Sequence, residues 1–574
     1  MASTTAMYTG LSGLNANARN LDVIGNNIAN VNTTAYKSNR LLFQTQFSRN
    51  FSLGSAPGET SGGTNPTQIG LGVRVGGTQR NFNPGSLSAT GNQSDLAIAG
   101  AGFFMVDRGL SRFYTRAGNF TLNPQQELVN GTGDRLMGWG VDQDFQVQRT
   151  TLQPVTIPLG QLRIAQATTM ADLTGNIRGD SSAVIANAGS RLTLGALTDT
   201  SGPISATSLL TNIENGAGVA IAAIGDVITL TGAHMGGTAG FDVSDTSLAV
   251  TATTTVQEYM DFLSEAFNIQ PTGANPNGFT PGVTLNAGTG EITVVGNTGS
   301  INDITFDDAN LEVRPGGTGT AVTPFQVTKN TSADGESVRT RLTVYDSLGN
   351  AVDVSVAMTL VSRGGATPGT TWRYDIASAD DNDGDPRIAT GTIQFDGDGQ
   401  LTDTTPLAIS IDRTTAGANS PLLFDLSFAD ITALGDGQAS STSTIAKLSS
   451  DGSALGELSG YSIGNDGIIQ GTFNNGLVRV LGQVAVAGFA NPEGLVDNGG
   501  NLFTVGADSG SPVVAEPGTM GTGGISSGAL ELSNVDLAAE FINLIVSSTG
   551  YSAASRVIST TDQLMQQLLV IGRG

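Results

Sequence analysis

Apolar residues recur at three- and four-residue steps near the N-terminus. The stripe consists of Leu11, Leu14, Ala18, Leu21 and Ile28, with Gly25 at the one missing step. This spacing predicts a helix from Ser3 to about Asn32. Its glycines each cost about 1 kcal/mol relative to alanine, and almost no charged pairs offset them. We therefore expect this helix to be mostly disordered when it is alone in water.

A second apolar stripe with a 3.5-residue period lies near the C-terminus. It consists of Leu537, Phe541, Leu544, Tyr551, Ile558, Met565 and Leu569. This period is typical of coiled coils. The two stripes predict helices that pair with each other and with other copies, although each helix could instead pack on its own domain. The Gly-, Ser-, Thr- and Pro-rich segments 54–67 and 506–528 favour pairing, because they predict linkers between the helices and the middle of the chain.

The middle of the chain shows the pattern of short strands separated by turns. The clearest predicted strands are residues 96–106, 113–122, 339–345, 352–360 and 478–489, bounded by Gly-Asn, Asn-Gly and Asp-Gly pairs. The amphipathic stretch from Thr253 to Phe267 predicts one further helix inside this region. The predicted fold is therefore multidomain. A helical coiled-coil domain comes from both chain ends, nested all-β domains lie between them, and the innermost insertion is α+β.

At 574 residues the chain is too long for a single core. Composition and pattern together predict a nested order of domains. The predicted limits are 1–35 for the N-terminal helix, 36–75 for a linker, 76–155 and 441–525 for a β domain, 156–173 and 319–440 for an inserted β domain, 174–318 for a further inserted domain, and 526–574 for the C-terminal helix.

Charge and cysteine usage exclude several classes of function. The net charge of −24 would repel nucleic acid and anionic membranes. The absence of cysteine rules out disulfides and thiolate metal sites. No basic residue precedes Arg19, and no apolar run is long enough to cross a membrane. We expect a protein without membrane insertion that, if it is exported, leaves the cell without a cleaved signal peptide.

The candidate chemistry is weak, and we predict no catalytic, cofactor or metal site. Asp381, Asp383 and Asp385 alternate as in a calcium loop, but Pro386 stands where that loop needs glycine. A single histidine, His234, cannot build a metal cluster. A secreted β-rich polysaccharide hydrolase or an adhesin stays open as an alternative class. Two tryptophans are few for sugar stacking, and an adhesin would lack the matching helical ends.

Several segments resemble the bacterial flagellar rod and hook protein family. Residues 10–14 (Gly-Leu-Ser-Gly-Leu) and 21–37 resemble its N-terminal signature, and residues 528–569 resemble its C-terminal helix. Residues 96–104 and 114–120 resemble its shared β domain, while 344–350 with 395–401 resemble a β domain of hook subunits. The signature residues matched here are Asn26, Asn27, Asn30, Thr33, Tyr36, Lys37, Asn534 and Asp536. Two departures affect turns: Ala35 replaces a glycine, and Asn123-Pro-Gln-Gln126 replaces an Asp-x-x-Gly turn.

The resemblance implies a structural subunit rather than an enzyme. The large inserted middle favours a subunit of the hook, the flexible hollow joint that passes motor torque to the filament, over a distal rod or hook-filament junction protein. The implied partners are copies of the same chain, the rod and junction proteins, the hook cap and the flagellar export apparatus. The implied location is extracellular, in the hook at the basal body. The two apolar stripes would be the assembly interface.

Overall fold

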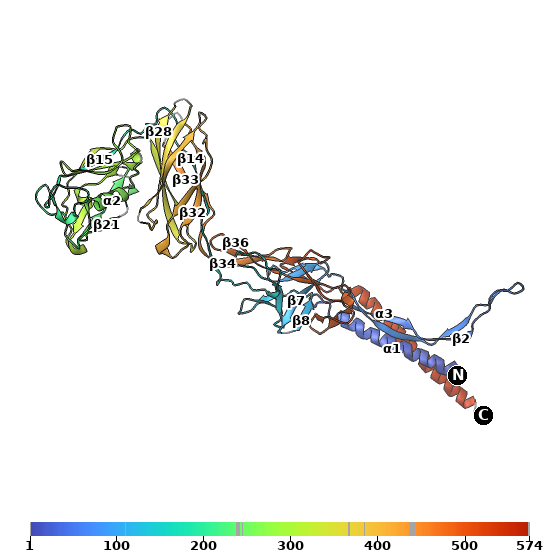
Figure 1. The fold of residues 1–574 in the computed structure, drawn as a ribbon. Helices are drawn as coiled ribbons and strands as arrows, with labels where there is room; N and C mark the ends of the chain where they lie inside the picture. Colours follow the sequence, from blue (N-terminus) through green and yellow to red (C-terminus); the bar gives the residue numbers. More distant parts are fainter. Residues whose placement is uncertain are drawn as a thin grey trace. The chain divides into compact units, whose positions relative to one another are not determined.

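The computed structural model describes residues 2–109, 111–236, 241–243, 245–271, 273–364, 368–383, 385–435 and 442–571. The chain forms two compact units. Unit 1 combines both chain ends, Met1–Arg163 and Glu457–Gly574, and unit 2 is the central segment Ile164–Gly456. The predicted nested order, with helices from both ends and β domains between them, is confirmed (Figure 1).

Two long helices from opposite chain ends lie side by side in unit 1. They are α1 (Ala2–Ala29) and α3 (Leu537–Ile571) (Figure 1). Asp536 caps α3, because its Oδ1 accepts the backbone N–H groups of Ala538 at 2.9 Å and Ala539 at 3.2 Å. A carboxylate at this end also complements the helix dipole. Both predicted terminal helices are therefore present, and they pack against each other.

The predicted linker 36–75 is largely a β hairpin, which we call the arm (residues 39–80). In the arm, β1 (Asn39–Thr45) pairs with β4 (Val73–Arg80), and β2 (Ser48–Ser52) pairs with β3 (Thr67–Gly70). The Gly- and Pro-rich segment between β2 and β3 turns the chain back rather than joining two domains. Both β1 and β4 contact α1, so the base of the arm belongs to the terminal helix pair.

The rest of unit 1 is a β domain, whose main sheet includes the path β34-β35-β36-β11-β7-β8-β39-β38. Its strands in chain order are β5 (Leu87–Ala89), β6 (Leu96–Ala99), β7 (Phe103–Arg108), β8 (Ser111–Thr115), β9 (Thr121–Leu122), β10 (Leu128–Val129), β11 (Arg135–Trp139), β12 (Gln153–Pro154), β34 (Ser453–Ile463), β35 (Ile468–Phe473), β36 (Val478–Val484), β37 (Val486–Gly488), β38 (Val496–Asp497), β39 (Leu502–Thr504), β40 (Val513–Ala515), β41 (Gly524–Ser527) and β42 (Ala529–Glu531). Edge-to-face contacts join Phe103 to Phe82, Phe489 and Phe503 in its core.

The second segment interpreted as a linker, 506–528, is not a linker but part of the β sheets. Strand β40 pairs with β37, β41 pairs with β6, and β42 pairs with β5. The glycines in this segment serve turns and close backbone approaches, so its composition resembles that of a linker although it belongs to the sheets. The C-terminal helix consequently follows directly from the β domain.

Unit 2 contains a β sandwich and an inner domain. One sheet of the sandwich has the order β27-β28-β29-β30 and the other β31-β32-β14-β33. Its strands are β14 (Met170–Asn176), β27 (Ser337–Tyr345), β28 (Ala351–Arg363), β29 (Thr370–Ala377), β30 (Arg387–Phe395), β31 (Leu407–Ile411), β32 (Leu422–Thr432) and β33 (Thr444–Ser450). Residues of both sheets, with Trp372 fully buried among them, form one core.

The inner domain is α+β, as predicted. Its strands are β15 (Gly189–Leu194), β16 (Leu197–Asp199), β17 (Ile213–Asn215), β18 (Val227–Leu230), β19 (His234–Met235), β20 (Phe241–Asp242), β21 (Thr246–Ala249), β22 (Gly282–Asn286), β23 (Glu291–Thr298), β24 (Ile304–Thr305), β25 (Leu311–Arg314) and β26 (Val327–Thr331). The predicted helix is α2 (Val256–Ala266), where Thr255 and Glu258 form a capping box. Its apolar face packs into a core that extends from Leu192 to Phe325.

Strand pairing shifts the domain limits from those predicted by composition. The inner domain runs from β15 to β26, because β26 pairs with β15, whereas the sequence predicted 174–318. The sandwich ends later than the predicted residue 440, since β33 pairs with β14; residues 436–441 lie outside the described part of the chain. Unit 2 begins at Ile164 rather than 156.

Both departures from the family turn pattern fall on left-handed residues. Ala35 has a φ of 55° and Gln126 a φ of 61°. Glycine adopts this region without strain, whereas other residues pay about 1–2 kcal/mol there. The chain therefore keeps the turn geometry without the glycine. At Ala35 the turn is held by the backbone N–H, which donates to the Glu531 carbonyl at 2.8 Å.

Candidate assembly site on the paired terminal helices

The face of α1 that contacts α3 consists mostly of small and polar residues, with Ile24 as a buried apolar member. They recur at alternating three- and four-residue steps: Gly10, Gly13, Asn17, Asn20, Ile24 and Asn27. A Cβ added at Gly10 would lie 3.1 Å from Ile558 Cγ1, and one added at Gly13 would lie 3.7 Å from Ala554 Cβ. A Cβ added at Gly550 on α3 would lie 3.1 Å from the Asn17 side chain. Small residues therefore let the two backbones approach closely.

Side-chain hydrogen bonds cross between the helices. Asn20 Nδ2 donates to Ser547 Oγ at 2.6 Å, and Asn27 Nδ2 donates to Glu540 Oε1 at 2.9 Å. Ser547 and Asn27 are almost fully buried. Buried polar pairs of this kind fix the register of paired helices, because a shift along the axis would leave the polar groups unpaired.

The predicted apolar stripes are rotated away from this contact face. On α1, Leu11 is exposed, whereas Leu14, Leu21 and Ile28 are half-buried. On α3, Leu544 and Ile558 are half-buried, and the exposed members are Leu537, Phe541, Tyr551, Met565 and Leu569. The structure thus brings Ile558 against α1 but leaves most of the stripes uncovered within one chain.

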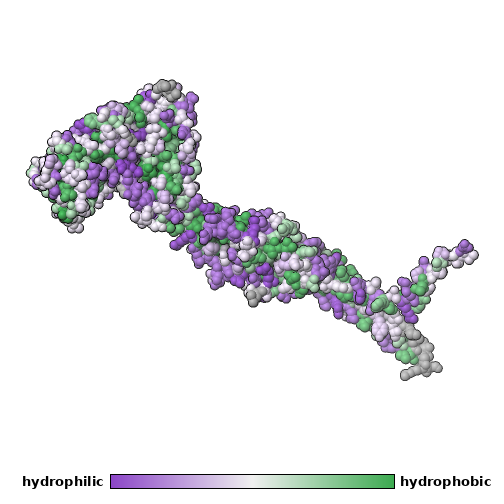
Figure 2. All heavy atoms as spheres, in the orientation of Figure 1, coloured by the Kyte–Doolittle hydropathy of each residue, from purple (hydrophilic) through white to green (hydrophobic). Residues whose placement is uncertain are grey.

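Apolar side chains are exposed on the outer side of α3. We call the set Phe541, Ile542, Ile545 and Val546 the outer face of α3; these side chains are 52%, 62%, 63% and 64% exposed, respectively. No charged residue occurs from 541 to 555. Figure 2 shows apolar surface interspersed with polar surface along the helix pair. Exposed apolar patches of this kind are typical of sites that bind another protein surface.

The signature residue Asn27 uses all its hydrogen-bonding capacity at the top of the helix pair. Its Nδ2 donates to the Asn39 carbonyl at 2.7 Å as well as to Glu540. Its Oδ1 accepts from the Asn39 N–H at 3.0 Å and from the Tyr36 hydroxyl at 3.2 Å. One buried amide therefore connects α1, the start of the arm and α3.

The other signature residues support the same junction. Asn30 Nδ2 donates to Asn26 Oδ1 at 3.0 Å, and Thr33 Oγ1 donates to Asn30 Oδ1 at 3.0 Å. Before α3, Asn534 Oδ1 accepts the Ser38 N–H at 2.8 Å, and its Nδ2 donates to the Asn81 carbonyl at 2.8 Å. These side chains hold backbone turns, which is a structural role rather than a catalytic one.

A buried ionic cluster ties the helix pair to the β domain. Glu531 Oε1 lies 2.6 Å from Lys37 Nζ, and Glu531 Oε2 lies 2.9 Å from Arg116 Nε. Arg116 also donates to the carbonyls of Gly100 and Gly102, both at 2.7 Å. All three charged side chains are almost fully buried. Sequence analysis selected Lys37 but missed Glu531 and Arg116, although both lie inside the segments that carried the family resemblance.

Charge balance in this cluster favours ionised Glu531. Burial alone would raise the pKa of Glu531, but Arg116 and Lys37 hold that pKa below its usual value. Burial lowers the pKa of Lys37, and the adjacent carboxylate of Glu531 opposes this effect. Two cations around one carboxylate make Glu531 the residue on which the cluster depends.

A pair of glycine substitutions tests the contact face. Gly10→Val should destabilise the helix pair by about 1–3 kcal/mol through overpacking, because the new Cβ would press on Ile558 and Ala554. Gly13→Ala, on the same face, meets only an ordinary contact at 3.7 Å, and it should stabilise the helix by up to about 1 kcal/mol. The helical circular dichroism signal during thermal melting measures both effects. Equal shifts in the two variants would contradict the assigned face.

The candidate chemistry set aside from the sequence finds no support in the described residues. Among them, no group of three or more His, Asp or Glu side chains is placed to hold a metal ion. Arg387 pairs with Asp385 at 2.6 Å, so the Asp-rich turn is tied down by a cation of the chain itself. None of the described helices is long and apolar enough to span a bilayer.

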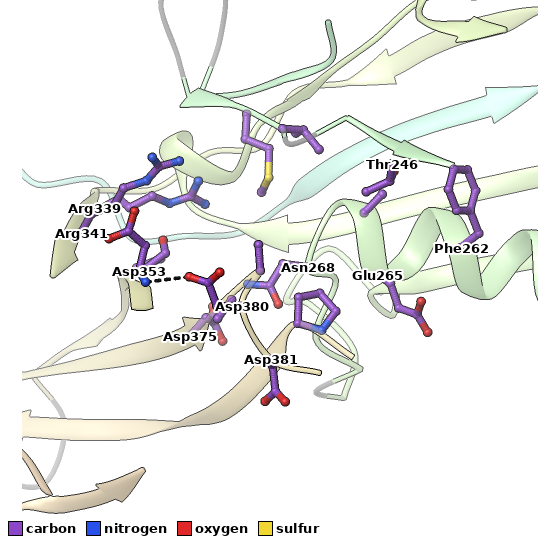
Figure 3. A pocket seen from close by; sticks show the side chains of 18 of the residues that line it. Thr246, Phe262, Glu265, Asn268, Arg339, Arg341, Asp353, Asp375, Asp380 and Asp381 are labelled. Carbon is purple, nitrogen blue, oxygen red and sulfur yellow. Dashed lines mark hydrogen bonds between the residues drawn. The ribbon is translucent and has the colours of Figure 1, made fainter. Parts of the chain in front are cut away.

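Unit 2 also contains a cavity of about 610 Å³ between the inner domain and the sandwich. The inner domain contributes Phe262 and Glu265, and the sandwich contributes Arg339, Asp353 and Asp375 (Figure 3). Burial lowers the pKa of Arg339 to about 10. The Asp353 N–H donates to Asp380 Oδ2 at 2.9 Å. Charges of both signs are mixed across its walls.

Four family models match the chain. "Flagella basal body rod protein" matches residues 7–37, and "Flagellar hook protein FlgE/F/G D1 domain" matches 97–175. "Flagellar basal body protein FlaE D2 domain" matches 310–453, and "Flagellar basal body rod FlgEFG protein C-terminal" matches 526–570. The matches thus cover both terminal helices, part of the β domain and most of the sandwich.

Relatives described as flagellar hook protein FlgE match over almost their whole length. The protein of Borreliella burgdorferi is 28% identical, covering 98% of each chain. That of Caulobacter vibrioides is 28% identical over all of both chains, and that of Escherichia coli is 27% identical over 98% of this chain and 99% of its own. The crystal structure of Helicobacter pylori flagellar hook protein FlgE2 covers 77% of this chain and 100% of its own, with a TM-score of 0.37 and 15% identity.

Proposed function

This chain belongs to the bacterial flagellar basal body rod and hook family as a hook protein, and we propose that its paired terminal helices join copies of it into the hollow tube of the hook. The protein is a structural subunit of bacterial motility and not an enzyme. The observation that carries the proposed assembly site is the exposed, uncharged outer face of α3. A single chain leaves this face in water, and copies of the chain can cover it.

The geometry of the helix pair favours open polymerisation. Its outer face is apolar, whereas the face shared by α1 and α3 is mostly small and polar, apart from Ile24 and Ile558. If the outer face of one copy meets a different surface of the next copy, the contact is heterologous and need not close into a ring. Burying apolar side chains at about 25 cal/mol per Å² then stabilises the ordered helices in the polymer. Assembly and helix order are therefore coupled.

The remaining partners follow from the place of a hook protein in the flagellum. The two ends of the tube would contact the rod and the hook-filament junction proteins, and the hook cap would guide the addition of subunits. The flagellar type III export apparatus would deliver the chain, without a cleaved signal peptide, to the outside of the cell. Weakly stabilised terminal helices suit this route, because a chain whose ends unfold readily can be threaded.

Hydrogen exchange tests the coupling between assembly and helix order. We expect amides of α1 and α3 to exchange at least about 100-fold faster in the monomer than in the polymer, since the outer face loses its cover. The buried strands of the sandwich, such as β28, serve as the internal control because they should be protected equally in both states. Full protection of both helices in the monomer would contradict the proposed coupling.

A further inference from the structure

We propose that the groove between α1 and the base of the arm receives the outer face of α3 from a second copy of the chain. This inference rests on the proposed assembly and names the surface that covers the exposed residues. The groove has a volume of about 460 Å³. Tyr8 and Leu11 line it from α1, and Phe47 and Leu71 line it from the arm.

Contacts at Ser12 hold the arm against α1 and so build the groove. Ser12 Oγ accepts the Val73 N–H at 3.2 Å. Gly72 approaches so closely that an added Cβ would collide with Ser12, and its φ of 112° is one that glycine adopts without strain. The Gln46 N–H donates to the Gly72 carbonyl at 2.8 Å, which closes the arm beside the helix. The groove is therefore a feature of the fold and not of a loose loop.

The groove and the outer face of α3 match in charge. The residues lining the groove include no charged side chain, and the first charged residue of the chain is Arg19. The stretch from 541 to 555 on α3 is also uncharged, in a chain of net charge −24. Two neutral surfaces avoid the repulsion that most other pairs of surfaces on this acidic chain would meet. A charged peptide partner would instead find no counter-charge in the groove.

The position of the groove around α1 leaves it open to a helix from another copy and not to the chain's own α3. At 100° per residue, the groove positions 5, 8, 12 and 15 lie roughly 140° around α1 from the positions that contact α3. The chain's own α3 therefore occupies a different side of α1. An amphipathic helix that presents residues at three- and four-residue steps is the usual occupant of such an apolar groove. Ile542, Ile545 and Val546 have this spacing.

Exposure of the groove's rim shows that it lacks an occupant in a single chain. Phe47 is 82% exposed, and Tyr8 is 71% exposed. Large aromatic side chains in this position are typical anchors of protein interfaces. Insertion of an α3 face between them would cover both rings and the outer face in one contact.

Disulfide cross-linking between two variants tests the proposed contact. The chain has no cysteine, so Phe47→Cys and Ile545→Cys can be made separately with tags of different size, mixed, polymerised and oxidised. Any link between the two variants then joins different copies. We expect at least about 10-fold more of this hetero-dimer than in a control mixture of Phe47→Cys with Val478→Cys, because disulfides form only when Cα atoms come within about 7 Å. Val478 is an exposed residue of the β domain.

Polymers that form normally but give no more hetero-dimer than the control would overturn the groove assignment while leaving the proposed assembly intact.

If a cysteine variant fails to polymerise, two charge variants test the groove assignment instead. Phe47→Asp should raise the critical concentration about 10-fold, and Leu53→Asp should change it less than about two-fold, since a desolvated carboxylate is costly only inside the contact. The two side chains are 82% and 81% exposed on the same arm. Equal effects would also overturn the inference.

Discussion

Replacing Phe541 with aspartate should abolish polymerisation while the chain stays folded. Phe541 is about half exposed in the single chain, so the substitution removes little packing there. In the polymer the new carboxylate would be buried in an uncharged surface, at a cost of at least about 3 kcal/mol per contact. That cost corresponds to a critical concentration raised about 100-fold or more. Sedimentation of the purified chain measures the critical concentration, and electron microscopy of the pellets shows whether tubes have formed.

Leu423→Asp is the matched control for this experiment. Leu423 is also an exposed apolar residue, but it lies on β32 in unit 2. The Leu423→Asp substitution should leave the critical concentration for polymerisation within about two-fold of the wild-type value, because an exposed carboxylate is well solvated. Normal tubes from Phe541→Asp would refute the assigned outer face. Loss of the native melting transition in that variant would show that Phe541 supports the monomer instead.

Replacing Glu531 with glutamine should destabilise unit 1 by about 3–5 kcal/mol, since it leaves two buried cations without their carboxylate. For a unit of this size the expected fall in melting temperature is roughly 6–15 °C. Differential scanning calorimetry of the monomer measures it. Glu457→Gln is the control, because Glu457 pairs with Arg163 at the surface, and such pairs contribute at most about 1 kcal/mol.

Acidic pH should remove the difference in melting temperature between the wild-type chain and Glu531→Gln. The folded-state pKa of Glu531 is lowered, so its carboxylate stabilises the folded chain above the unfolded value of about 4.3. This stability is lost as the pH falls through the folded pKa. The gap in melting temperature should therefore be full at pH 6 to 7 and shrink below about pH 4. A gap that stays constant down to pH 3 would mean that the ion pairs do not carry the effect.

Periodicity predicted the existence and pairing of the terminal helices, but not the faces that meet. The stripe through Leu11 and Phe541 follows apolar residues, whereas the actual contact uses Gly10, Asn20 and Ser547. Within a single chain, sequence rules assign apolar residues to the core. In a subunit of a polymer the same residues can be reserved for other copies, so the pattern alone cannot separate the two uses.

Composition misled the prediction wherever glycine-rich sequence was taken for a linker. The segments 54–67 and 506–528 are rich in small residues because hairpin turns and close strand crossings need them. The ionic cluster escaped prediction for another reason. Lys37, Arg116 and Glu531 are far apart along the chain, and only the folded β domain brings them together. By contrast, the signals for α2 are local, and its capping box at Thr255 lies within the predicted stretch from Thr253 to Phe267.

The polar contact between α1 and α3 determines how easily the chain's ends come apart. Amide and hydroxyl groups such as those of Asn20 and Ser547 lose little when they exchange each other for water. Separating the two helices therefore exposes mainly polar groups, together with a few apolar side chains such as Ile24 and Ile558. A largely polar contact of this kind would let the two chain ends separate during the proposed export and pair again during the proposed assembly.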